Sequence, residues 1–255
     1  MARGEMLAAV LHGKLDLRLE HRPIPLPGPG QVLVRIVAVG ICGSDVHFWK
    51  DGRIGTRVVE RPMILGHECA GEVVALGEGV AAFQVGDRVA LEPGIPCGFC
   101  PWCRTGRYNL CPQVRFLAAP PTDGALAEYV AHPAALTYKL PAHLSYEEGA
   151  LLEPLSVGLH AVERAGVRVG DRVLIAGAGP IGLVNLFAAK AHGASQVYLT
   201  DIRPHRLELA CRLGAEAAID ARETPGVQQK MQEFTEGYGV DIALDCSGSS
   251  PGIDD

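Results

Sequence analysis

The sequence has no excess of positive charge, no long hydrophobic run and too few cysteines for a disulfide scaffold. Its formal net charge is -6, so it offers no basic surface to nucleic acid. The apolar run from Met6 to Leu11 is too short for a signal peptide, and nothing approaches the length that spans a membrane. We therefore expect a cytoplasmic protein that binds neither nucleic acid nor membrane.

What is present is typical of a folded protein with two domains. The chain has 255 residues, of which 48% are hydrophobic and 20% charged. In the first half, short apolar runs separated by Gly-containing turns predict an all-β domain, a small barrel. Its expected strands are 6–11, 15–20 (after a turn at Gly13), 31–39, 71–76 and 87–91. The proline-rich stretch 21–30 is expected to cross the surface as an extended connector.

The second half is organised around a glycine-rich turn. A short apolar strand, 173–176, runs into Gly177-Ala-Gly179-Pro180-Ile181-Gly182, and an apolar helix is expected over 183–192. In a G-x-G-x-x-G turn the first glycine permits the tight turn, the second admits a pyrophosphate, and the third lets helix pack on strand. The phosphates would bind the free N–H groups at the helix N-terminus. The alternative is an ordinary glycine turn in a structural βαβ unit.

The next strand supplies the acid that a dinucleotide site needs. Residues 196–200 read as a strand that delivers Asp201, close to the expected spacing of ~20 residues for a group that holds a ribose 2′-OH. A carboxylate there repels a 2′-phosphate, so we predict a preference for NAD over NADP. Arg203 and Arg206 lie nearby in sequence and could soften that repulsion.

Two more helices and two more strands are expected after Asp201. A helix is expected from Pro204 to Gly214, a strand at 217–219, a helix at 226–235 and a strand at 241–245. This gives four parallel strands, whereas a complete dinucleotide sheet of this type has six. We therefore expect a partial sheet whose fourth strand is an aggregation-prone edge, and weak cofactor binding with little turnover by these 255 residues.

Four of the eight cysteines fall in one short segment. Cys97, Cys100, Cys103 and Cys111 have spacings that can wrap four thiolates around one tetrahedral ion. In a reducing cytosol such a cluster indicates a metal more often than disulfides. A site closed by four thiolates has no place for substrate, so its zinc would be structural. The alternative is four free thiols in a loop.

Two earlier segments offer a different set of ligands. One places Cys42, Ser44 and His47 close together, and the other places His67 directly before Glu68. Zinc accepts this mixture of S, N and O ligands, and a catalytic zinc keeps one position open. The alternative is that such single residues belong to the core or the surface. Since the two ligand sets cannot share one tetrahedron, we predict two zinc ions per chain.

A carboxylate farther along the chain joins the candidates for the zinc site. Ser145 and Glu148 form a capping box that opens a helical stretch running to Arg164. Within it, Glu153 is an acid among apolar residues, followed by a proline. A buried carboxylate costs several kcal/mol unless it is paired or lies near a metal. The alternative is an exposed turn of the helix.

Together these motifs resemble the zinc-containing medium-chain dehydrogenases, most closely the polyol branch that contains sorbitol (L-iditol) and xylitol dehydrogenases. The segments that carry the resemblance are 40–47, 66–68, 86–89, 153–156 and 177–182. The resemblance implies an α/β protein with a GroES-like catalytic domain, 1–157, and a Rossmann domain, 158–255. It also implies that Cys42, His67 and Glu68 bind the catalytic zinc, with Glu153 a ligand or a neighbour acting through bound water.

The activity implied by the resemblance is hydride transfer from a secondary alcohol of a polyol to NAD, giving a ketose. Ser44 and His47 would relay the released proton, although His47 could instead be a solvated surface residue, and Arg206 would contact the ribose end of NAD. Homo-oligomers are usual in the family. Two alternatives stay open: a zinc- and nucleotide-binding chain without turnover, and a dehydrogenase of threonine or a short diol.

Two features depart from the polyol branch. Some animal sorbitol dehydrogenases lack the cysteine segment, whereas this chain has all four thiols. Polyol enzymes commonly carry tyrosine where this chain has Phe48, so a hydroxyl that would face the substrate is expected to be absent. The choice of a particular polyol therefore does not follow from the sequence.

Overall fold

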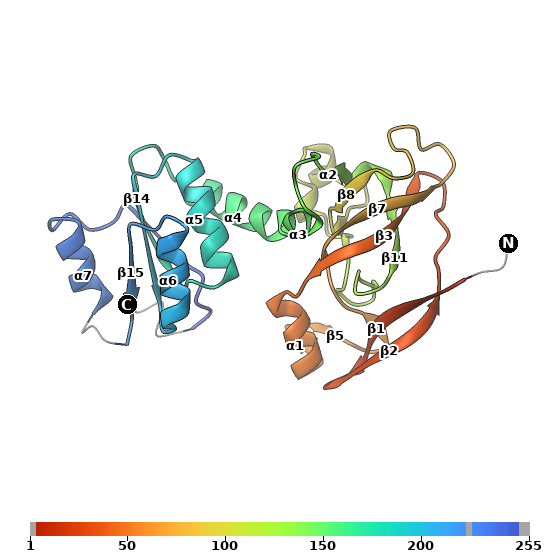
Figure 1. Ribbon diagram of the computed structural model, residues 1–255, viewed down its shortest axis with the longest axis horizontal. Helices are drawn as coiled ribbons and strands as arrows, with labels where there is room; N and C mark the ends of the chain where they lie inside the picture. The colour runs from red at the N-terminus through yellow and green to blue at the C-terminus, as the bar shows by residue number, and fades with distance from the viewer. Residues whose placement is uncertain (1–3, 223–225, 250–255) are drawn as a thin grey trace. The chain divides into compact units, whose positions relative to one another are not determined.

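The computed structural model describes residues 4–222 and 226–249 (Figure 1). The chain folds into two compact units, Met1–Glu153 and Pro154–Asp255. The boundary lies in helix α4 (Leu152–Ala165), as does the end of the first domain expected from the sequence, after residue 157. Among the described residues, no helix has the length and apolar character needed to span a membrane.

The first unit is built on a five-stranded antiparallel sheet with strand order β11-β3-β7-β8-β12. The strands are β3 (Gln31–Gly40), β7 (Glu68–Leu76), β8 (Arg88–Leu91), β11 (Tyr129–Pro133) and β12 (Thr137–Lys139). Alternate residues of these strands, among them Val32, Val34, Val73 and Val89, form a buried apolar cluster. Burial of these β-branched side chains holds the sheet together.

A second, three-stranded sheet has the order β2-β1-β6. It contains β1 (Glu5–Gly13), β2 (Asp16–Pro23) and β6 (Met63–Ile64). The hairpin turn falls on Lys14 and Leu15, and not on Gly13 as the sequence suggested; Leu15 has a positive φ of 62°. Residues 21–23 of the expected connector belong to β2, which tolerates Pro23 because β2 is an outer strand.

Short elements surround the two sheets. They are α1 (Gly43–Asp51), β4 (Arg53–Ile54), β5 (Arg57–Val58), β9 (Gly94–Ile95), α2 (Pro101–Arg104), a 3-10 turn (Tyr108–Leu110), β10 (Arg115–Phe116) and a 3-10 turn (Ala134–Leu136). Helix α1 was not expected from the sequence. It is capped by residues at both ends: Asp45 accepts a hydrogen bond from the N–H of Cys42 at 3.0 Å, and Gly52 adopts the left-handed conformation.

The helical stretch after the first unit's sheets is divided in two. The capping box is confirmed, since Ser145 Oγ accepts from the Glu148 N–H at 3.1 Å and Glu148 Oε2 accepts from the Ser145 N–H at 2.7 Å. It opens the short helix α3 (Tyr146–Ala150), and α4 begins two residues after α3 ends. Pro154 has no N–H to donate to the carbonyl of Ala150, so the chain restarts with the proline in the first turn of α4.

The second unit contains a four-stranded parallel sheet with strand order β15-β14-β13-β16. Its elements are β13 (Arg172–Ala176), α5 (Pro180–Ala191), β14 (Gln196–Asp201), α6 (Pro204–Arg212), β15 (Ala217–Asp220), α7 (Val227–Phe234) and β16 (Ile242–Asp245). The four expected strands are present. Helix α5 begins at Pro180, inside the glycine turn, because proline suits the first position of a helix. The core contains Val173, Ile175, Leu186 and Leu199, all fully buried.

Candidate metal centres and dinucleotide turn

The first group of metal ligands lies where strands β3 and β7 meet. Cys42, His67 and Glu68 each offer one ligand atom, and these atoms lie within 4.8 Å of one another. Cys42 follows β3 and is the N-cap of α1, whereas Glu68 is the first residue of β7 and pairs with Gly40 across the sheet. His67 and Glu68 are buried, and Cys42 is half-buried.

Gly40 makes room for the Glu68 carboxylate. A Cβ atom at position 40 would overlap Oε2 of Glu68 and would lie 3.0 Å from its Cβ. A side chain at this point of β3 would therefore push the carboxylate away from Cys42 and His67. The absence of a side chain at position 40 is a requirement of the ligand geometry.

Asp45 ties the two segments of this group together. Its carboxylate is buried and accepts hydrogen bonds from the N–H of Cys42 at 3.0 Å and of Gly66 at 2.9 Å. The same carboxylate lies 3.8 Å from Nδ1 of His67. A carboxylate behind a metal-ligating histidine commonly fixes the ring orientation. The sequence reasoning gave Asp45 no role, although the spacing Cys-x-x-Asp at a helix start was a signal for it.

The surroundings of the ligands carry an excess of negative charge. Burial raises the pKa of Glu153; the negative charges of Glu68, Glu92 and Asp45 add to that rise, and His67 opposes it. Glu153 is half-buried and is not part of the group of three ligand atoms. Four partly or fully buried carboxylates (Asp45, Glu68, Glu92 and Glu153) near one thiol and one imidazole suit a divalent cation.

The two residues expected to relay a proton have different environments. Ser44 is half-buried and hydrogen-bonds the sulfur of Cys42, which opposes the rise that burial causes in the pKa of that thiol. The side chain of His47 is 67% exposed, and its Nδ1 lies 3.4 Å from Oδ2 of Asp51 on the same helix. Ser44 thus lies beside the candidate ligand Cys42, whereas His47 lies on the solvent face of α1.

An aromatic ring packs against the candidate ligand His67. The ring of Phe116 lies edge-on to it, with centroids 5.3 Å apart and planes at 62°. Phe116 belongs to β10, which pairs with β9, and these two short strands flank the cysteine segment in sequence. Phe116, which follows the cysteine segment in the chain, therefore connects that segment to the group formed by Cys42, His67 and Glu68.

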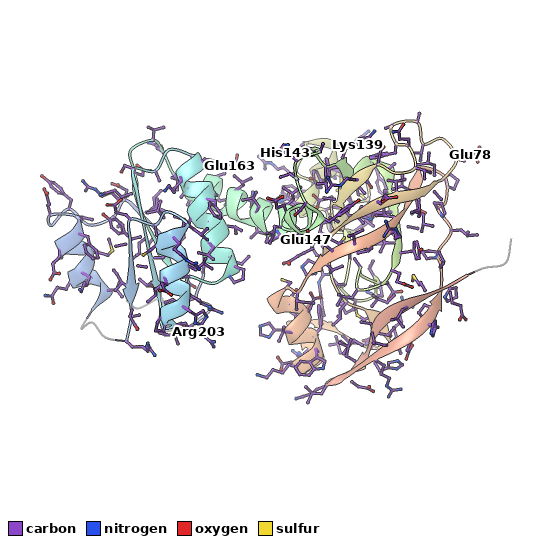
Figure 2. All side chains as sticks on the ribbon, viewed as in Figure 1. Glu78, Lys139, His143, Glu147, Glu163 and Arg203 are labelled. Atoms are coloured by element: carbon purple, nitrogen blue, oxygen red, sulfur yellow. The ribbon has the colours of Figure 1, made fainter. Side chains whose placement is uncertain are left out.

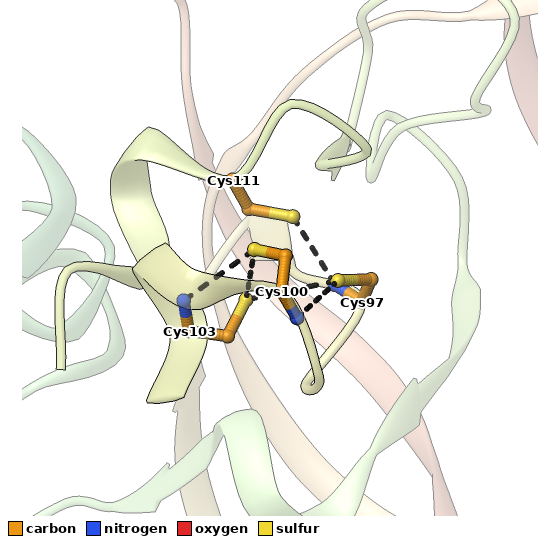
Figure 3. Close-up of side chains that lie close together, drawn as sticks. All are labelled: Cys97, Cys100, Cys103 and Cys111. Carbon is orange, nitrogen blue, oxygen red and sulfur yellow. Dashed lines mark hydrogen bonds between the residues drawn. The ribbon is translucent and has the colours of Figure 1, made fainter. Parts of the chain in front are cut away.

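The second group, Cys97, Cys100, Cys103 and Cys111, gathers four sulfurs in one lobe (Figure 3). Their ligand atoms lie within 4.8 Å of one another, with Cys97 Sγ 3.9 Å and Cys100 Sγ 3.4 Å from Cys103 Sγ. Four sulfurs at about 2.3 Å from a tetrahedral zinc would lie about 3.8 Å apart. The distances fit a zinc ion.

Backbone N–H groups in the lobe point at the sulfurs. Cys100 N donates to Cys97 Sγ at 3.4 Å, Cys103 N to Cys100 Sγ at 3.5 Å and Cys97 N to Cys111 Sγ at 3.4 Å. Backbone donors, that of Phe99 first, lower the pKa of Cys97 to about 7. Desolvation and the neighbouring sulfurs raise the pKa of Cys103 to about 12. Holding all four as thiolates therefore requires a cation.

The glycine turn of the second unit has the geometry that its three glycines predict. Gly177 has a φ of 98°, and a Cβ there would lie 2.8 Å from the backbone of Cys246. A Cβ on Gly182 would overlap the carbonyl of Gly177, so the third glycine permits close helix–strand packing. Gly179 caps α5, and the nearest atom to a Cβ there is Arg206 Nη1 at 3.6 Å. The helix N-terminus is thus open to a phosphate.

Asp201 faces this turn from the end of β14. Its Oδ2 accepts from the N–H of Ala178 at 3.0 Å and lies 3.4 Å from Nη1 of Arg206. Its Oδ1 accepts from the N–H of Arg203, which Figure 2 labels beside α6. The structure therefore brings the turn, the acid and Arg206 together in one unit.

Comparisons with known proteins agree with these features. Residues 28–142 match the model of the alcohol dehydrogenase GroES-like domain, and residues 180–255 match that of the zinc-binding dehydrogenases. A sorbitol dehydrogenase of Gallus gallus is 52% identical over 248 residues, which cover 97% of this chain and 70% of the relative.

Solved structures of dehydrogenases are also similar to this chain over nearly its whole length. An oxidoreductase of unknown specificity from Escherichia coli superposes with a TM-score of 0.93 at 41% identity, covering 98% of this chain and 72% of that one. A 2R,3R-butanediol dehydrogenase from Bacillus subtilis has a TM-score of 0.85 at 40% identity, covering 95% and 71%.

Proposed function

The chain belongs to the zinc-binding, NAD(P)-dependent medium-chain dehydrogenases, and from this membership we propose that it oxidises a secondary alcohol of a polyol such as sorbitol or xylitol with NAD, giving a ketose. The observation that carries the proposal is the convergence of Cys42, His67 and Glu68 at the meeting point of β3 and β7. The 52% identity with a sorbitol dehydrogenase supports the substrate class. A reducing, cytoplasmic location is part of the proposal, because the cysteine lobe needs free thiols.

We assign the metal-binding roles as follows. Cys42, His67 and Glu68 would hold the catalytic zinc, and the four lobe cysteines would hold a structural zinc. When bound, the catalytic zinc would supply a Lewis acid that lowers the pKa of an alcohol, and NAD would accept the hydride. Asp45 would keep the Cys42 and His67 segments in place, and the carboxylate of Glu153 would balance charge beside them.

The route of the proton would begin at Ser44, which already hydrogen-bonds the Cys42 sulfur. The exposed imidazole of His47 would pass the proton to solvent. Phe48 takes no part in this route: it is 3% exposed and packs in a cluster with Leu11, Met63 and Leu65. Substrate recognition by a hydroxyl at position 48 is therefore not part of the proposal.

For the cofactor we propose NAD, with Gly177, Gly179, Pro180, Ile181 and Gly182 around the pyrophosphate and Arg206 at the ribose end. The side chain of Asp201, only 6% exposed, already accepts hydrogen bonds at the turn, and its oxygens would accept the ribose hydroxyl. We expect Asp201→Ala to weaken NAD binding at least about tenfold and to narrow the difference between NAD and NADP.

The cofactor prediction is measured by titrating both nucleotides into wild type and variant. The matched control is Asp220→Ala, which removes the same side chain from the end of the neighbouring strand β15. An unchanged ratio of NAD to NADP affinity in Asp201→Ala would show that Asp201 does not select the cofactor.

A second candidate substrate class is a short vicinal diol. It is favoured by the 40% identity with a structure of 2R,3R-butanediol dehydrogenase. Initial rates with sorbitol, xylitol, 2,3-butanediol and threonine at equal concentrations would separate the candidates. Rates with the two polyols at least tenfold above the others are expected, and the opposite order would replace the proposal.

Zinc content, nucleotide binding and turnover should be measured on one preparation. We expect two zinc ions per chain and saturable NAD binding. Polyol-dependent NADH formation supports an enzyme, whereas zinc and nucleotide binding without turnover supports a binding function for these residues. One zinc or none would contradict the assignment of the two ligand groups.

A further inference from the structure

Strand β2 is an outer strand with an apolar face in solvent. It pairs with β1 on one side, and among the described residues no strand pairs with its other side. Leu17 and Leu19 are 44% and 72% exposed, and they lie on the same side of the strand because alternate residues share a face. Outer strands of this length are usually covered by other segments or protected from pairing, because their free N–H and C=O groups can pair with another chain.

The other face of β2 carries charges of alternating sign. Asp16, Arg18, Glu20 and Arg22 occupy alternate positions and therefore share that face. Within the strand, Arg18 pairs with Asp16 at 2.6 Å and Arg22 with Glu20 at 2.9 Å. These side chains are partly exposed, so their charges can also act across the open edge.

We propose that β2 pairs in antiparallel fashion with β2 of a second copy of this chain, with Leu19 opposite Leu19. In this register Asp16 faces Arg22 of the other copy, and Arg18 faces its Glu20. Each of these charges then meets one of opposite sign, and such cross-strand pairs stabilise a sheet.

The charges exclude the neighbouring registers. A shift of two residues in one direction places Arg18 opposite Arg22 and Glu20 opposite Glu20. A shift of two in the other direction places Asp16 opposite Glu20 and Arg18 opposite Arg18. A shift of one places apolar residues opposite charged ones. Like charges directly opposite each other destabilise a sheet, so the register centred on Leu19 is favoured over these three. A shift of four residues again pairs opposite charges, but over a shorter stretch of the strand.

The arrangement closes on itself. Antiparallel pairing of identical outer strands follows from a twofold axis, which gives a closed dimer and not a filament. The two three-stranded sheets would join into one, the free backbone groups of both β2 strands would be satisfied, and the two exposed Leu19 side chains would contact each other. The partner that fits this edge is therefore a second copy of the chain.

Two single charge reversals test the register. Arg18→Glu places glutamate opposite Glu20 twice in a homodimer, and Glu20→Arg places arginine opposite Arg18 twice. We expect each variant alone to self-associate at least tenfold more weakly than wild type. In an equimolar mixture every facing pair is again of opposite sign, so heterodimers should form with wild-type affinity.

Sedimentation equilibrium of the zinc-loaded 255-residue chain measures these affinities. Arg168→Glu, the same reversal at an exposed position in the second unit, is the matched control and should behave as wild type. Circular dichroism and zinc content establish that each variant is folded. A monomeric wild type, variants that associate as wild type does, or a mixture that fails to restore association would each overturn the proposal.

Discussion

The two groups of candidate metal ligands in the first unit are built in opposite ways. All four lobe cysteines come from one segment between residues 97 and 111, and only Cys111 among them is buried. Nearby Phe99 is 67% exposed, so the lobe has little apolar core of its own. The other ligands come from segments far apart in sequence, yet they meet at the ends of adjacent sheet strands and are held by the buried Asp45. A site without a core depends on its metal for structure, whereas a site carried by a sheet does not.

The two groups should differ most in how the fold responds when one ligand is removed from each. We expect Cys100→Ser to lower the zinc content from two to one and to unfold the lobe, because zinc contributes on the order of 10 kcal/mol to a small closed site. His67→Ala should abolish polyol oxidation while keeping a cooperative fold. Zinc analysis, limited proteolysis and thermal unfolding of both variants check this.

If His67→Ala also became sensitive to proteolysis between residues 97 and 111, the two groups would be structurally dependent on each other. The edge-on contact of Phe116 with His67 would then be the route to examine.

Asp45 sharpens the comparison because it belongs to one group only. Asp45 accepts from the Cys42 N–H through Oδ2 and from the Gly66 N–H through Oδ1. Asp45→Asn keeps only one of these two acceptor oxygens and removes the negative charge. We expect the zinc affinity of the group formed by Cys42, His67 and Glu68 to fall by about 10–100-fold, and the zinc affinity of the cysteine lobe to stay unchanged. Competition with a chelator measures both, and Asp51→Asn, on the exposed side of α1, is the control. Equal loss at both groups would contradict the prediction.

His132 provides a pH-dependent test of the sheet that carries the first group. Its ring is fully buried in β11 and donates through Nε2 to the carbonyl of Glu92 at 3.0 Å. Burial lowers the pKa of His132 from 6.5 to about 4. Between these values the unfolded chain binds a proton that the folded chain rejects, so stability present above pH 6.5 is lost as the pH falls towards 4.

We expect His132 to make the wild type about 2 kcal/mol less stable at pH 5 than at pH 7.5. His132→Gln can still donate to the carbonyl but does not titrate, so its stability should fall by that much less over the same range. Urea unfolding of both proteins at the two pH values gives the difference, in which other titrating groups cancel. Parallel pH profiles would show that His132 does not titrate as described.

The smallest effect on metal content is expected at Glu153. Glu153 does not belong to the group formed by Cys42, His67 and Glu68, so Glu153→Gln should retain two zinc ions per chain. Its polyol oxidation should fall, since a neutral amide changes the charge beside the metal. A variant with one zinc would instead identify Glu153 as a required direct ligand.

The sequence predicted those features that depend on local spacing. The four cysteines, the glycine turn and the capping box each lie within one short segment, and their geometry follows from residue type and spacing. The four parallel strands were likewise readable, because fully buried strands leave continuous apolar runs such as Val173–Ala176.

Features that depend on tertiary contacts were missed or misplaced. Helix α1 lacks an apolar periodicity and is fixed by its caps and by Asp45, whose second acceptor bond reaches Gly66 in another segment. The hairpin turn was assigned to Gly13, whereas the strand pairing carries that glycine into β1 and leaves Leu15 in the strained position. The break between α3 and α4 depended on one missing donor, that of Pro154.

The lack of a side chain at Gly40, where the Glu68 carboxylate lies, has an evolutionary consequence. Positions 40 and 68 face each other across β3 and β7, and only one of them can carry bulk at this point. A descendant that acquired a side chain at position 40 would have to give up or redirect its carboxylate at position 68 in the same lineage. Among related sequences, the two positions should therefore change together, and loss of this glycine would mark chains that have changed their metal ligand or abandoned the metal.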